Sequence, residues 1–291
     1  MKQKALTYLQ LMRLPNIFTA MADVMAGYLI VLGPNFQWPA LIGLCIATTA
    51  LYAGGCVLND ICDRDLDAVE RPFRPIPSKQ VSVKEAYFLL CFLFAVGLLA
   101  ALCAGLPSLF AALILVLLII AYDTLSKDIV VLGAFNMGAC RSCNLILGMS
   151  PAFHLQGIFM ILPLIPLIYV SSLTALSKFE VHGGLGRRGV PVLAGWAGVI
   201  CFILWLKFYG DLNPWMFVYL ALFILYTGPA LLRSIRDRQA QSVGLAVKTL
   251  VLAIPILDAV YCAGFQGFLY GIPVILCIAP AVLIARYLYV T

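Results

Sequence analysis

The sequence predicts an all-α polytopic membrane protein, and two observations lead to this fold class. Of the 291 residues, 63% are hydrophobic and 11% are charged, and the mean hydropathy is +1.02. A soluble domain carries about 25% charged residues. The apolar residues also form runs close to the roughly 20 residues that a helix needs to cross a membrane. Such a chain cannot keep its surface in water, so lipid must be its solvent.

Ten apolar runs are candidates for membrane-spanning helices. They cover, in chain order, residues 14–32, 39–58, 85–105, 108–122, 129–150, 157–177, 190–207, 213–232, 243–263 and 268–287. The fourth run is short, and the ninth is interrupted by Lys248, Pro255 and Asp258, so nine spans are also possible. The first residues read as a basic amphipathic lead-in to the first span. Because no polar stretch exceeds the one between Asn59 and Lys84, we expect residues 1–291 to form a single transmembrane domain.

The positive charges are distributed unevenly between the two sides of the predicted bundle. If the N-terminus is cytoplasmic, alternate loops place all 19 Lys and Arg except Lys207 and Arg141 on the cytoplasmic side. Cytoplasmic loops of membrane proteins carry an excess of basic residues. The net charge of +6 is therefore a topology signal and gives no reason to expect nucleic acid as a partner. We expect the long polar loops to face the cytoplasm.

Four aspartates gather directly after the second span, in the segment NDICDRDLD at residues 59–67. If the span continues as a helix, Asn59, Asp63 and Asp67 recur at i, i+4 and i+8 and share one face, with Asp60 beside Asp63. Like charges stacked in this way repel one another. A helix that keeps them usually holds a cation, and oxygen ligands suit Mg²⁺. The alternative is a solvated, charged helix end that binds nothing.

A proline-rich segment, ERPFRPIPSK, follows at residues 70–79. Its three prolines prevent a regular helix and stiffen the loop. They hold Arg71 and Arg74 near the acidic face, where guanidinium groups can form paired hydrogen bonds with phosphate oxygens. The alternative is that both arginines pair with lipid headgroups. An acidic face followed by two positioned arginines is what a metal–diphosphate ligand needs.

These residues resemble the first signature of the UbiA superfamily of intramembrane prenyltransferases, NDxxDxxxD followed by an Arg-Pro-rich segment. The signature covers residues 59–67, the Arg-Pro-rich part covers 71–77, and the membrane topology agrees over nearly the whole chain. The resemblance implies a helical bundle around a central cavity that opens sideways to lipid. It also implies that Asn59, Asp60, Asp63 and Asp67 hold Mg²⁺ and a diphosphate at the cytoplasmic mouth.

Three further features of this family can be located. The family motif YxxxK follows the fourth span, and here Tyr122 and Lys127 are separated by one extra residue. The motif DxxxD follows the sixth span, where Glu180 keeps one carboxylate and Gly184 replaces the other. We expect Glu180 to face the first motif as a metal ligand, and Asn16 occupies the place of a polar cavity residue. The loss at Gly184 leaves open a one-metal arrangement, an altered chemistry, or a binding protein without catalysis.

The fifth span resembles a narrower group, the UbiA-related proteins encoded in Ebo-type bacterial clusters (EboC-like). The resemblance lies in MGACRSCN at residues 137–144 and LGM at residues 147–149. We accordingly expect an integral protein of a bacterial inner (cytoplasmic) membrane. Cys140 and Cys143 have CxxC spacing, but they lie mid-helix without a second pair, which argues against a zinc or redox site.

Three ionisable residues lie inside predicted spans, where charge is expensive: Asp23, Arg141 and Asp258. One interpretation is an ion pair of Arg141 with Asp23 or Asp258 that only fixes helix packing. Asp258 could instead be a structural partner of Lys248. The other interpretation is that Arg141, with Asn144 close by on the same helix, shapes the cavity and binds the diphosphate or the acceptor.

The resemblance implies Mg²⁺-dependent transfer of the prenyl group of a prenyl diphosphate to a lipophilic acceptor, aromatic or otherwise electron-rich, within the membrane. Arg71, Arg74 and Lys127 would assist the metal in neutralising the departing diphosphate. A dry cavity would protect the resulting allylic cation from water. The alternative is a protein of the same fold that binds or transports lipids or prenyl diphosphates. A transporter would move its ligand unchanged, whereas a transferase would release pyrophosphate.

Overall fold

The structure is a computed structural model that describes residues 2–152, 157–180, 189–237 and 239–285. Within these ranges the chain is helical, with short connections and no strand. The first half contains α1 (Lys2–Leu11), α2 (Leu14–Leu32), the 3₁₀ turn η1 (Gly33–Asn35), α3 (Trp38–Cys62), α4 (Arg64–Glu70), α5 (Val83–Ala104), α6 (Leu106–Ala121), the π-turn η2 (Tyr122–Ser126) and α7 (Val130–Met149). The second half contains α8 (Ile158–Ile161), α9 (Leu164–Ser177), α10 (Val190–Tyr209), α11 (Met216–Asp237), α12 (Ala240–Leu252), α13 (Ile254–Gln266), α14 (Phe268–Ile275) and α15 (Ile278–Ala285).

Ten helical segments within the described ranges are long and apolar enough to cross a membrane, which confirms the higher of the two predicted counts. The fourth span is complete because α6 continues into η2, giving a segment from Leu106 to Ser126. The ninth span is also complete, although it bends between α12 and α13. Pro255 lies in the first turn of α13, where backbone N–H groups have no partner within the helix, so a proline costs no helical hydrogen bond.

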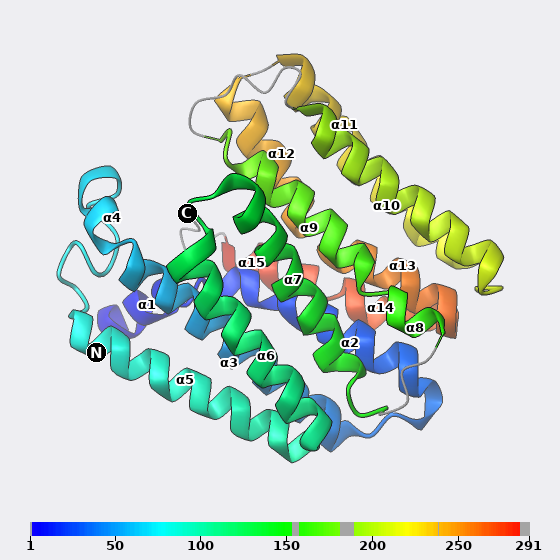
Figure 1. Cartoon of the computed structure of the whole chain (residues 1–291), viewed down its shortest axis with the longest axis horizontal. Helices are drawn as coiled ribbons and strands as arrows, with labels where there is room; N and C mark the ends of the chain where they lie inside the picture. Colours follow the sequence, from blue (N-terminus) through cyan, green and yellow to red (C-terminus); the bar gives the residue numbers. More distant parts are fainter. Residues whose placement is uncertain (1, 153–156, 181–188, 238, 286–291) are drawn as a thin grey trace.

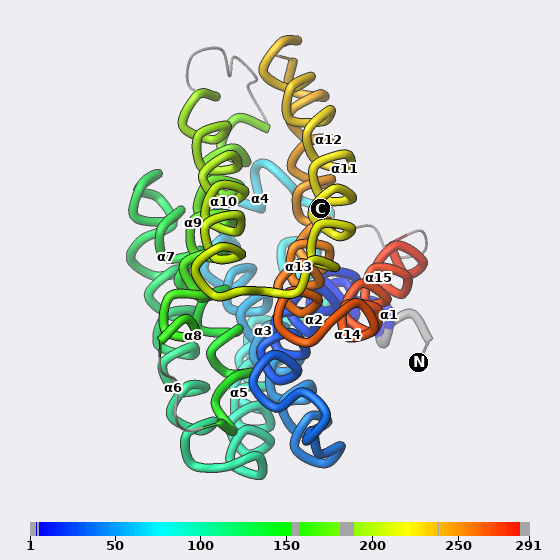
Figure 2. The backbone as a smooth tube through the Cα atoms, turned by 90° about the vertical axis from the view of Figure 1, so that its right-hand side faces the viewer, coloured from blue at the N-terminus to red at the C-terminus, as the bar shows by residue number. Residues whose placement is uncertain are grey.

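The helices form an inner and an outer set. Within an apolar stretch of 18 consecutive residues in each span, 67% of the residues are buried in the α2 span and 61% in the α3 span, whereas 22% are buried in the α5 and α10 spans. Figure 1 shows α5 and α6 along one side of the bundle, α10 and α11 along the opposite side, and α2 and α7 between them. In Figure 2, α14 and α15 lie against α2. The outer helices expose large apolar side chains such as Phe88 and Phe110, which suit a lipid environment.

Small residues let the inner helices approach one another closely. α2 packs against α7 at Gly148, where an added Cβ would overlap the carbonyl oxygen of Val24. α7 in turn packs against α9 at Gly138, where an added Cβ would overlap the carbonyl oxygen of Leu167. Glycine at close helix crossings is typical of membrane bundles. These contacts bring polar side chains of α2, α3 and α7 together around one cavity.

Candidate active site

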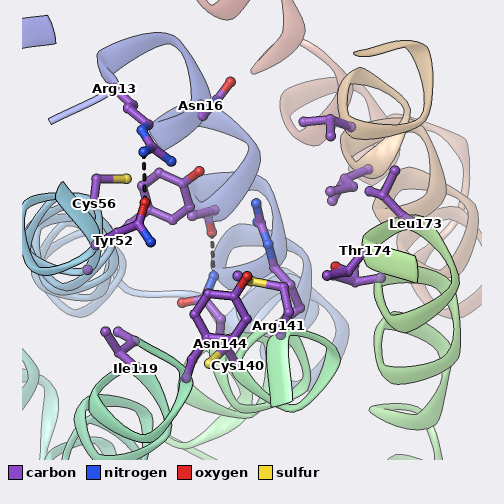
Figure 3. A pocket seen from close by; sticks show the side chains of 18 of the residues that line it. Arg13, Asn16, Tyr52, Cys56, Ile119, Cys140, Arg141, Asn144, Leu173 and Thr174 are labelled. Atoms are coloured by element: carbon purple, nitrogen blue, oxygen red, sulfur yellow. Dashed lines mark hydrogen bonds between the residues drawn. The ribbon is translucent and has the colours of Figure 1, made fainter. Parts of the chain in front are cut away.

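A cavity of about 350 Å³ lies between the inner helices. One wall is formed by the start of α2 together with α3, α6, η2 and α7, and the other by α9, α12 and the start of α13. Figure 3 looks into this cavity: Arg13, Asn16 and Tyr52 lie on one side, and Leu173 and Thr174 lie across from them. The central cavity implied by the family resemblance is therefore present.

The two walls differ in chemistry. The first wall carries most of the polar lining, namely Arg13, Asn16, Thr48, Tyr52, Asn59, Tyr122, Asp123, Arg141 and Asn144. The second wall is mostly aliphatic and includes Val170, Leu173, Val247, Val251 and Ile254. Binding sites for small molecules commonly combine an apolar lining with a few placed polar groups. The arrangement suits an elongated ligand with a charged head and a hydrocarbon chain.

The end of α3 brings together two of the predicted metal ligands, Asn59 and Asp63. α3 ends at Cys62, and the backbone at Asp63 turns to a ψ of 2° before α4 begins. Helical hydrogen bonding continues across this turn, because the Asp63 N–H donates to the Asn59 carbonyl oxygen at 2.9 Å. Asn59 Nδ2 also donates to Asp63 Oδ2 at 3.1 Å. These two side chains therefore share one face, as the sequence predicts.

Asp67 does not join that face, which corrects the predicted stripe of Asn59, Asp63 and Asp67. Arg74 Nη1 lies 2.6 Å from Asp67 Oδ2 and 3.4 Å from Asp60 Oδ1. Asp60 is thus grouped with Asp67 rather than with Asp63, because the backbone changes direction at Asp63, between α3 and α4. The buried Arg74 bonds to these carboxylates, so the alternative of a contact with lipid headgroups does not hold for this arginine.

Arg13 links the two groups of ligands. Its Nη2 donates to Asn59 Oδ1 and to Asp60 Oδ1, both at 2.9 Å. Its backbone is left-handed, with φ 48° and ψ 51°, a conformation that disfavours a non-glycine residue by roughly 1–2 kcal/mol. In the sequence, Arg13 is predicted only as one of the basic residues before the first span. Arg13 directly precedes α2, and Pro15 in the first turn of this helix is the local sequence signal for that helix start.

A π-turn accounts for the extra residue between Tyr122 and Lys127. The Lys127 N–H donates to the Tyr122 carbonyl oxygen at 3.0 Å, an i→i+5 bond. A π-turn holds one residue more than an α-turn, and such turns are frequent at functional sites. The turn absorbs the additional residue and returns Lys127 to the site, where its ammonium pairs with the Asp63 carboxylate. It also places Asp123 in the cavity wall, where Asn59 Nδ2 donates to Asp123 Oδ1 at 2.9 Å.

Helix α7 supports the π-turn from the side. Asn136 is oriented so that its Oδ1 accepts from the Tyr122 N–H and from Ser126 Oγ, both at 3.0 Å. Gly133 lets α7 approach the turn, since an added Cβ would lie 2.8 Å from the Ser126 carbonyl oxygen. The position of Asp123 and Lys127 therefore depends on packing between α6 and α7 as well as on the local sequence.

The second predicted motif falls only partly within the described residues. Glu180 is half-buried just beyond α9, and this burial raises the pKa of its carboxyl, while the positive charge of Arg71 acts in the opposite direction. The influence of Arg71 on Glu180 places the two polar loops on the same side of the bundle. Glu180 is not among the residues that line the cavity, and Gly184 lies outside the described residues.

Arg141 combines the two roles that the sequence leaves open. Its Nη1 lies 2.8 Å from Asp23 Oδ2, so the predicted ion pair between helices is present. Its guanidinium also lines the cavity, with its carbon 5.5 Å from the centre of the Tyr52 ring. Asn144 lies beside it and donates to the same oxygen of Asp23 at 2.9 Å. Binding of a substrate by Arg141 and Asn144 stays a prediction.

Two residues of α3 that line the cavity, Thr48 and Tyr52, were not predicted from the sequence. Both lie in an apolar run and precede Asn59 by eleven and seven residues. This spacing returns each of them to the face of the helix that carries Asn59. Helical periodicity counted backwards from the acidic segment is therefore the signal that could have found them.

The donor set fits Mg²⁺ in type. Asn59, Asp60, Asp63, Asp67 and Asp123 offer only oxygen ligands, which hard cations prefer. Within the described part of the chain, no three His, Cys, Asp or Glu side chains converge closely enough to hold a metal by themselves. Mg²⁺ does not require such a cage, because it is commonly bound through one or two carboxylates, water and substrate phosphates. Arg13, Arg74 and Lys127 balance the carboxylates in this structure.

Comparison with known proteins identifies relatives across most of the chain. The UbiA prenyltransferase family matches residues 20–242. A digeranylgeranylglyceryl phosphate synthase from Sulfolobus acidocaldarius is 33% identical over 196 residues, which are 64% of this chain and 68% of that protein. A solved structure of a digeranylgeranylglyceryl phosphate synthase superposes with a TM-score of 0.70 at 20% identity, covering 91% of this chain and 99% of that one.

A UbiA homologue from Archaeoglobus fulgidus, solved with GPP and Mg²⁺, has a TM-score of 0.57 at 14% identity and covers 92% of this chain and 99% of that one. At these identities the two structural likenesses establish the fold. The EboC-like branch, the bacterial inner membrane and the cytoplasmic orientation of the loops stay predictions. Ten apolar helices and the family match agree on an integral membrane protein. The chain belongs to the UbiA prenyltransferase family.

Proposed function

We propose that this protein transfers the prenyl group of a prenyl diphosphate to a lipophilic acceptor within the membrane, with Mg²⁺ as cofactor. The observation that carries the proposal is the cavity itself, which joins the Asn59 end of α3 to an aliphatic wall on α9 and α12. A prenyl diphosphate has a charged head and a hydrocarbon tail in the same relation. The ligands of the solved Archaeoglobus fulgidus homologue, GPP and Mg²⁺, agree with this assignment.

The head of the donor would lie at the mouth of the cavity, among the side chains that now pair with one another. Arg13, Arg74 and Lys127 each bond to a carboxylate of the first motif. Their N–H groups are suitable donors to phosphate oxygens, and the arginines can make two parallel bonds. Arg71, near Glu180, and Tyr122 would complete the binding of the diphosphate. These long side chains can exchange a carboxylate for a phosphate without movement of the helices.

Asn59, Asp60, Asp63 and Asp67 would hold Mg²⁺, with Glu180 facing them from the end of α9. When bound, Mg²⁺ supplies positive charge where negative charge grows on the departing diphosphate. Asp123 adds a carboxylate next to Asn59, at hydrogen-bond distance from its amide. The first motif thereby has an additional acidic neighbour, although Gly184 provides none in the second motif.

The reaction needs a cavity that separates the reacting carbon from water. The bond between the first prenyl carbon and the bridging oxygen breaks, and both electrons leave with the diphosphate. Arg13, Arg74 and Lys127 would stabilise this charge by preorganised electrostatics. The aliphatic wall keeps water from the allylic cation until an oxygen or carbon of the acceptor forms the new bond. A hydroxyl acceptor then releases its proton to the free diphosphate.

For the acceptor, we propose a lipid alcohol that carries a phosphate. The relatives reported above make, by their name, a glyceryl phosphate that carries two geranylgeranyl groups. In this chain, Arg141 lines the cavity together with Asn16 and Asn144, which offers a cation and two amides for a phosphate or hydroxyl group. This lipid acceptor replaces the aromatic compound as the favoured class. An electron-rich aromatic acceptor remains the comparison compound in the experiment.

The test measures pyrophosphate release by purified protein in lipid nanodiscs. Geranyl, farnesyl and geranylgeranyl diphosphates are each combined with a prenylglyceryl phosphate or with a phenolic acceptor, in Mg²⁺ or in EDTA. Asp63→Ala is compared with Asp65→Ala, a matched control because Asp65 is exposed and pairs only with the neighbouring Arg64 among the described residues. We expect Mg²⁺-dependent release that requires the glyceryl acceptor, is lost in Asp63→Ala and persists in Asp65→Ala.

Two other outcomes would change the assignment. Binding of the donors with Mg²⁺ but no release with either acceptor would favour a binding protein or transporter of the same fold. Release with the phenolic acceptor alone would keep the transferase and overturn the proposed acceptor. Equal activity of Asp63→Ala and Asp65→Ala would overturn the metal site at the end of α3.

A further inference from the structure

Two aspartates from distant parts of the chain meet in the interior of the bundle, below the polar wall of the cavity. Asp23 lies on α2 and Asp258 on α13, and each is 1% exposed. α2 packs against α13, and each acid has one buried carboxylate oxygen, Asp23 Oδ1 and Asp258 Oδ2, without a hydrogen-bond partner among the described residues. The two carboxyl groups lie close enough to interact electrostatically. The ion pair that the sequence allows between Asp258 and Lys248 is not found among the described residues. Among the described residues Asp258 forms no ion pair, and its hydrogen-bond partner is the hydroxyl of Tyr261.

The charges around this contact do not balance if both acids are ionised. Arg141 is the cation that contacts the pair, with Nη1 2.8 Å from Asp23 Oδ2. The other polar neighbours are neutral: Asn144 donates to Asp23 at 2.9 Å, and the Tyr261 hydroxyl donates to Asp258. Two carboxylates and one guanidinium would leave a net negative charge inside the membrane. An uncompensated charge in such a place is strongly unfavourable.

Hydrogen bonding points to the same imbalance. Asp23 Oδ1 and Asp258 Oδ2 are both buried, and neither has a hydrogen-bond partner among the described residues while both acids are ionised. Two ionised carboxylates in contact repel each other, and a shared proton removes the repulsion. One proton would give each of these oxygens a partner, because an O–H on one acid donates to the other acid.

We propose that Asp258 carries this proton and donates it to Asp23, so that Asp23 remains the ionised partner of Arg141. The choice between the two acids follows from their neighbours. Asp23 accepts from the charged Arg141 and from Asn144, and both donors favour its ionised form. Asp258 accepts from the hydroxyl of Tyr261, which is a neutral group. The cluster of Asp23, Arg141 and Asp258 is then neutral as a whole.

The consequence concerns Arg141, which lines the cavity. Asp23 and Thr19 hold its two terminal nitrogens at 2.8 Å each, and the ring of Tyr52 lies beside the guanidinium. Asp258 does not line the cavity and acts through Asp23, so it is a positioning residue. Because Asp258 is protonated, it does not repel the ionised Asp23, and the negative charge of Asp23 is balanced by Arg141. The cluster thereby fixes one cation in the polar wall, whichever acceptor the cavity receives.

The test compares three variants in the intact protein. Asp258→Asn replaces the carboxyl O–H by an amide N–H that can donate to Asp23 in the same way. Asp258→Leu keeps the branched shape of the side chain without a donor, although it is larger, and Asp23→Asn removes the charge that Arg141 pairs with. Infrared difference spectra detect the C=O stretch of a protonated carboxyl, and thermal unfolding in detergent reports stability. Neither measurement depends on the acceptor or on turnover.

We expect a protonated-carboxyl band in the wild-type protein that shifts in D₂O and is missing in Asp258→Asn. The unfolding temperature of Asp258→Asn should lie within about 2 °C of the wild type, whereas Asp23→Asn and Asp258→Leu should unfold at least about 5 °C lower. Asp258→Asn should also retain kcat/KM within about threefold of the wild type. A wild-type spectrum without the band, a band unchanged in Asp258→Asn, or equal stability of Asp23→Asn and Asp258→Asn would overturn the proposal.

Discussion

Two charged regions beside the cavity use the same residue types for different purposes: the mouth, with Asp60, Asp63, Asp67, Arg13, Arg74 and Lys127, and the floor, with Asp23, Arg141 and Asp258. At the mouth, Asp63 and Lys127 form an ion pair in which the side chains are 23% and 15% exposed. At the floor, Asp23 and Arg141 form an ion pair in which the side chains are 1% and 9% exposed. Ion pairs near water are screened and exchange partners readily, whereas a buried pair is strongly destabilised by loss of one partner. The pair of Asp63 and Lys127 is therefore suited to exchange its counter-ion for a ligand, and the pair of Asp23 and Arg141 to keep it.

The number of alternative partners separates the two regions further. At the mouth, Arg13 and Arg74 both contact Asp60, so that no single contact decides the arrangement. At the floor, Arg141 is the cation in contact with the pair of buried acids. A divalent cation should therefore replace an arginine at the mouth and fail to replace the arginine at the floor. The following experiments test this difference.

Removal of one arginine from each region should give the largest contrast in stability. Arg141→Met is expected to lower the free energy of unfolding by about 3–5 kcal/mol, because it leaves a buried carboxylate without its partner. Arg74→Met should lose less, and millimolar Mg²⁺ should restore part of that loss by binding Asp60 and Asp67. Detergent-titrated unfolding with Mg²⁺ or EDTA measures both effects. The proposed difference between mouth and floor would be contradicted if Mg²⁺ restored the stability of Arg141→Met. It would also be contradicted if Mg²⁺ restored the stability of neither variant.

Shortening the π-turn should reduce activity strongly while leaving the floor intact. Deletion of Thr124 would convert the π-turn into an α-turn and rotate the residues before it by about 100° relative to those after it. Asp123 and Lys127 could then no longer contact Asn59 and Asp63 together. We expect kcat/KM to fall by about 100-fold, equivalent to roughly 2.7 kcal/mol. Thr124→Ala is the matched control, since it removes only a hydroxyl that bonds to the Ile120 carbonyl oxygen.

Mg²⁺ and pyrophosphate should bind cooperatively at the mouth. Without a phosphate, Arg74 and Lys127 occupy the carboxylates, and Mg²⁺ is expected to bind weakly. With pyrophosphate present, the Arg74 and Lys127 side chains can bind its oxygens instead. Asp63 and Asp67 are then free to bind Mg²⁺. We expect each ligand alone to change the unfolding temperature little and the two together to raise it by about 5 °C. Additive shifts, or a full shift with Mg²⁺ alone, would mean that the carboxylates are already available.

The smallest expected effect concerns pH and Glu180. Burial raises the pKa of this carboxyl, opposed by Arg71, so protonation begins at a higher pH than for an exposed glutamate. If the ionised form holds the metal, kcat/KM should fall as the pH decreases through this raised pKa. Glu180→Gln should show lower activity at neutral pH and should lack this part of the pH profile. If kcat/KM fell in the same way at low pH in the wild type and in Glu180→Gln, the titrating group would be a residue other than Glu180.

The predictions that the structure confirms depend mostly on residues close together in the sequence. The ten spans follow from apolar runs of sufficient length, and the acidic segment at 59–67 follows from residues close together in the chain. The contact between Asn59 and Asp63 follows from helical spacing alone. Such features depend on composition and on neighbours within two turns, which a single sequence displays directly.

Tertiary structure decided the partners that lie far apart in sequence. Asp67 meets Arg74 and Asp60 because the backbone changes direction at Asp63, and Asn59 reaches Asp123 across 64 residues because α3 packs against the π-turn. Arg141 pairs with Asp23, which is 118 residues away in the sequence. Asp258 interacts with the same acid and not with Lys248. The sequence shows that these charges must be compensated in the membrane. Only helix packing decides which partner is within reach, because close crossings at glycines set the distances between side chains.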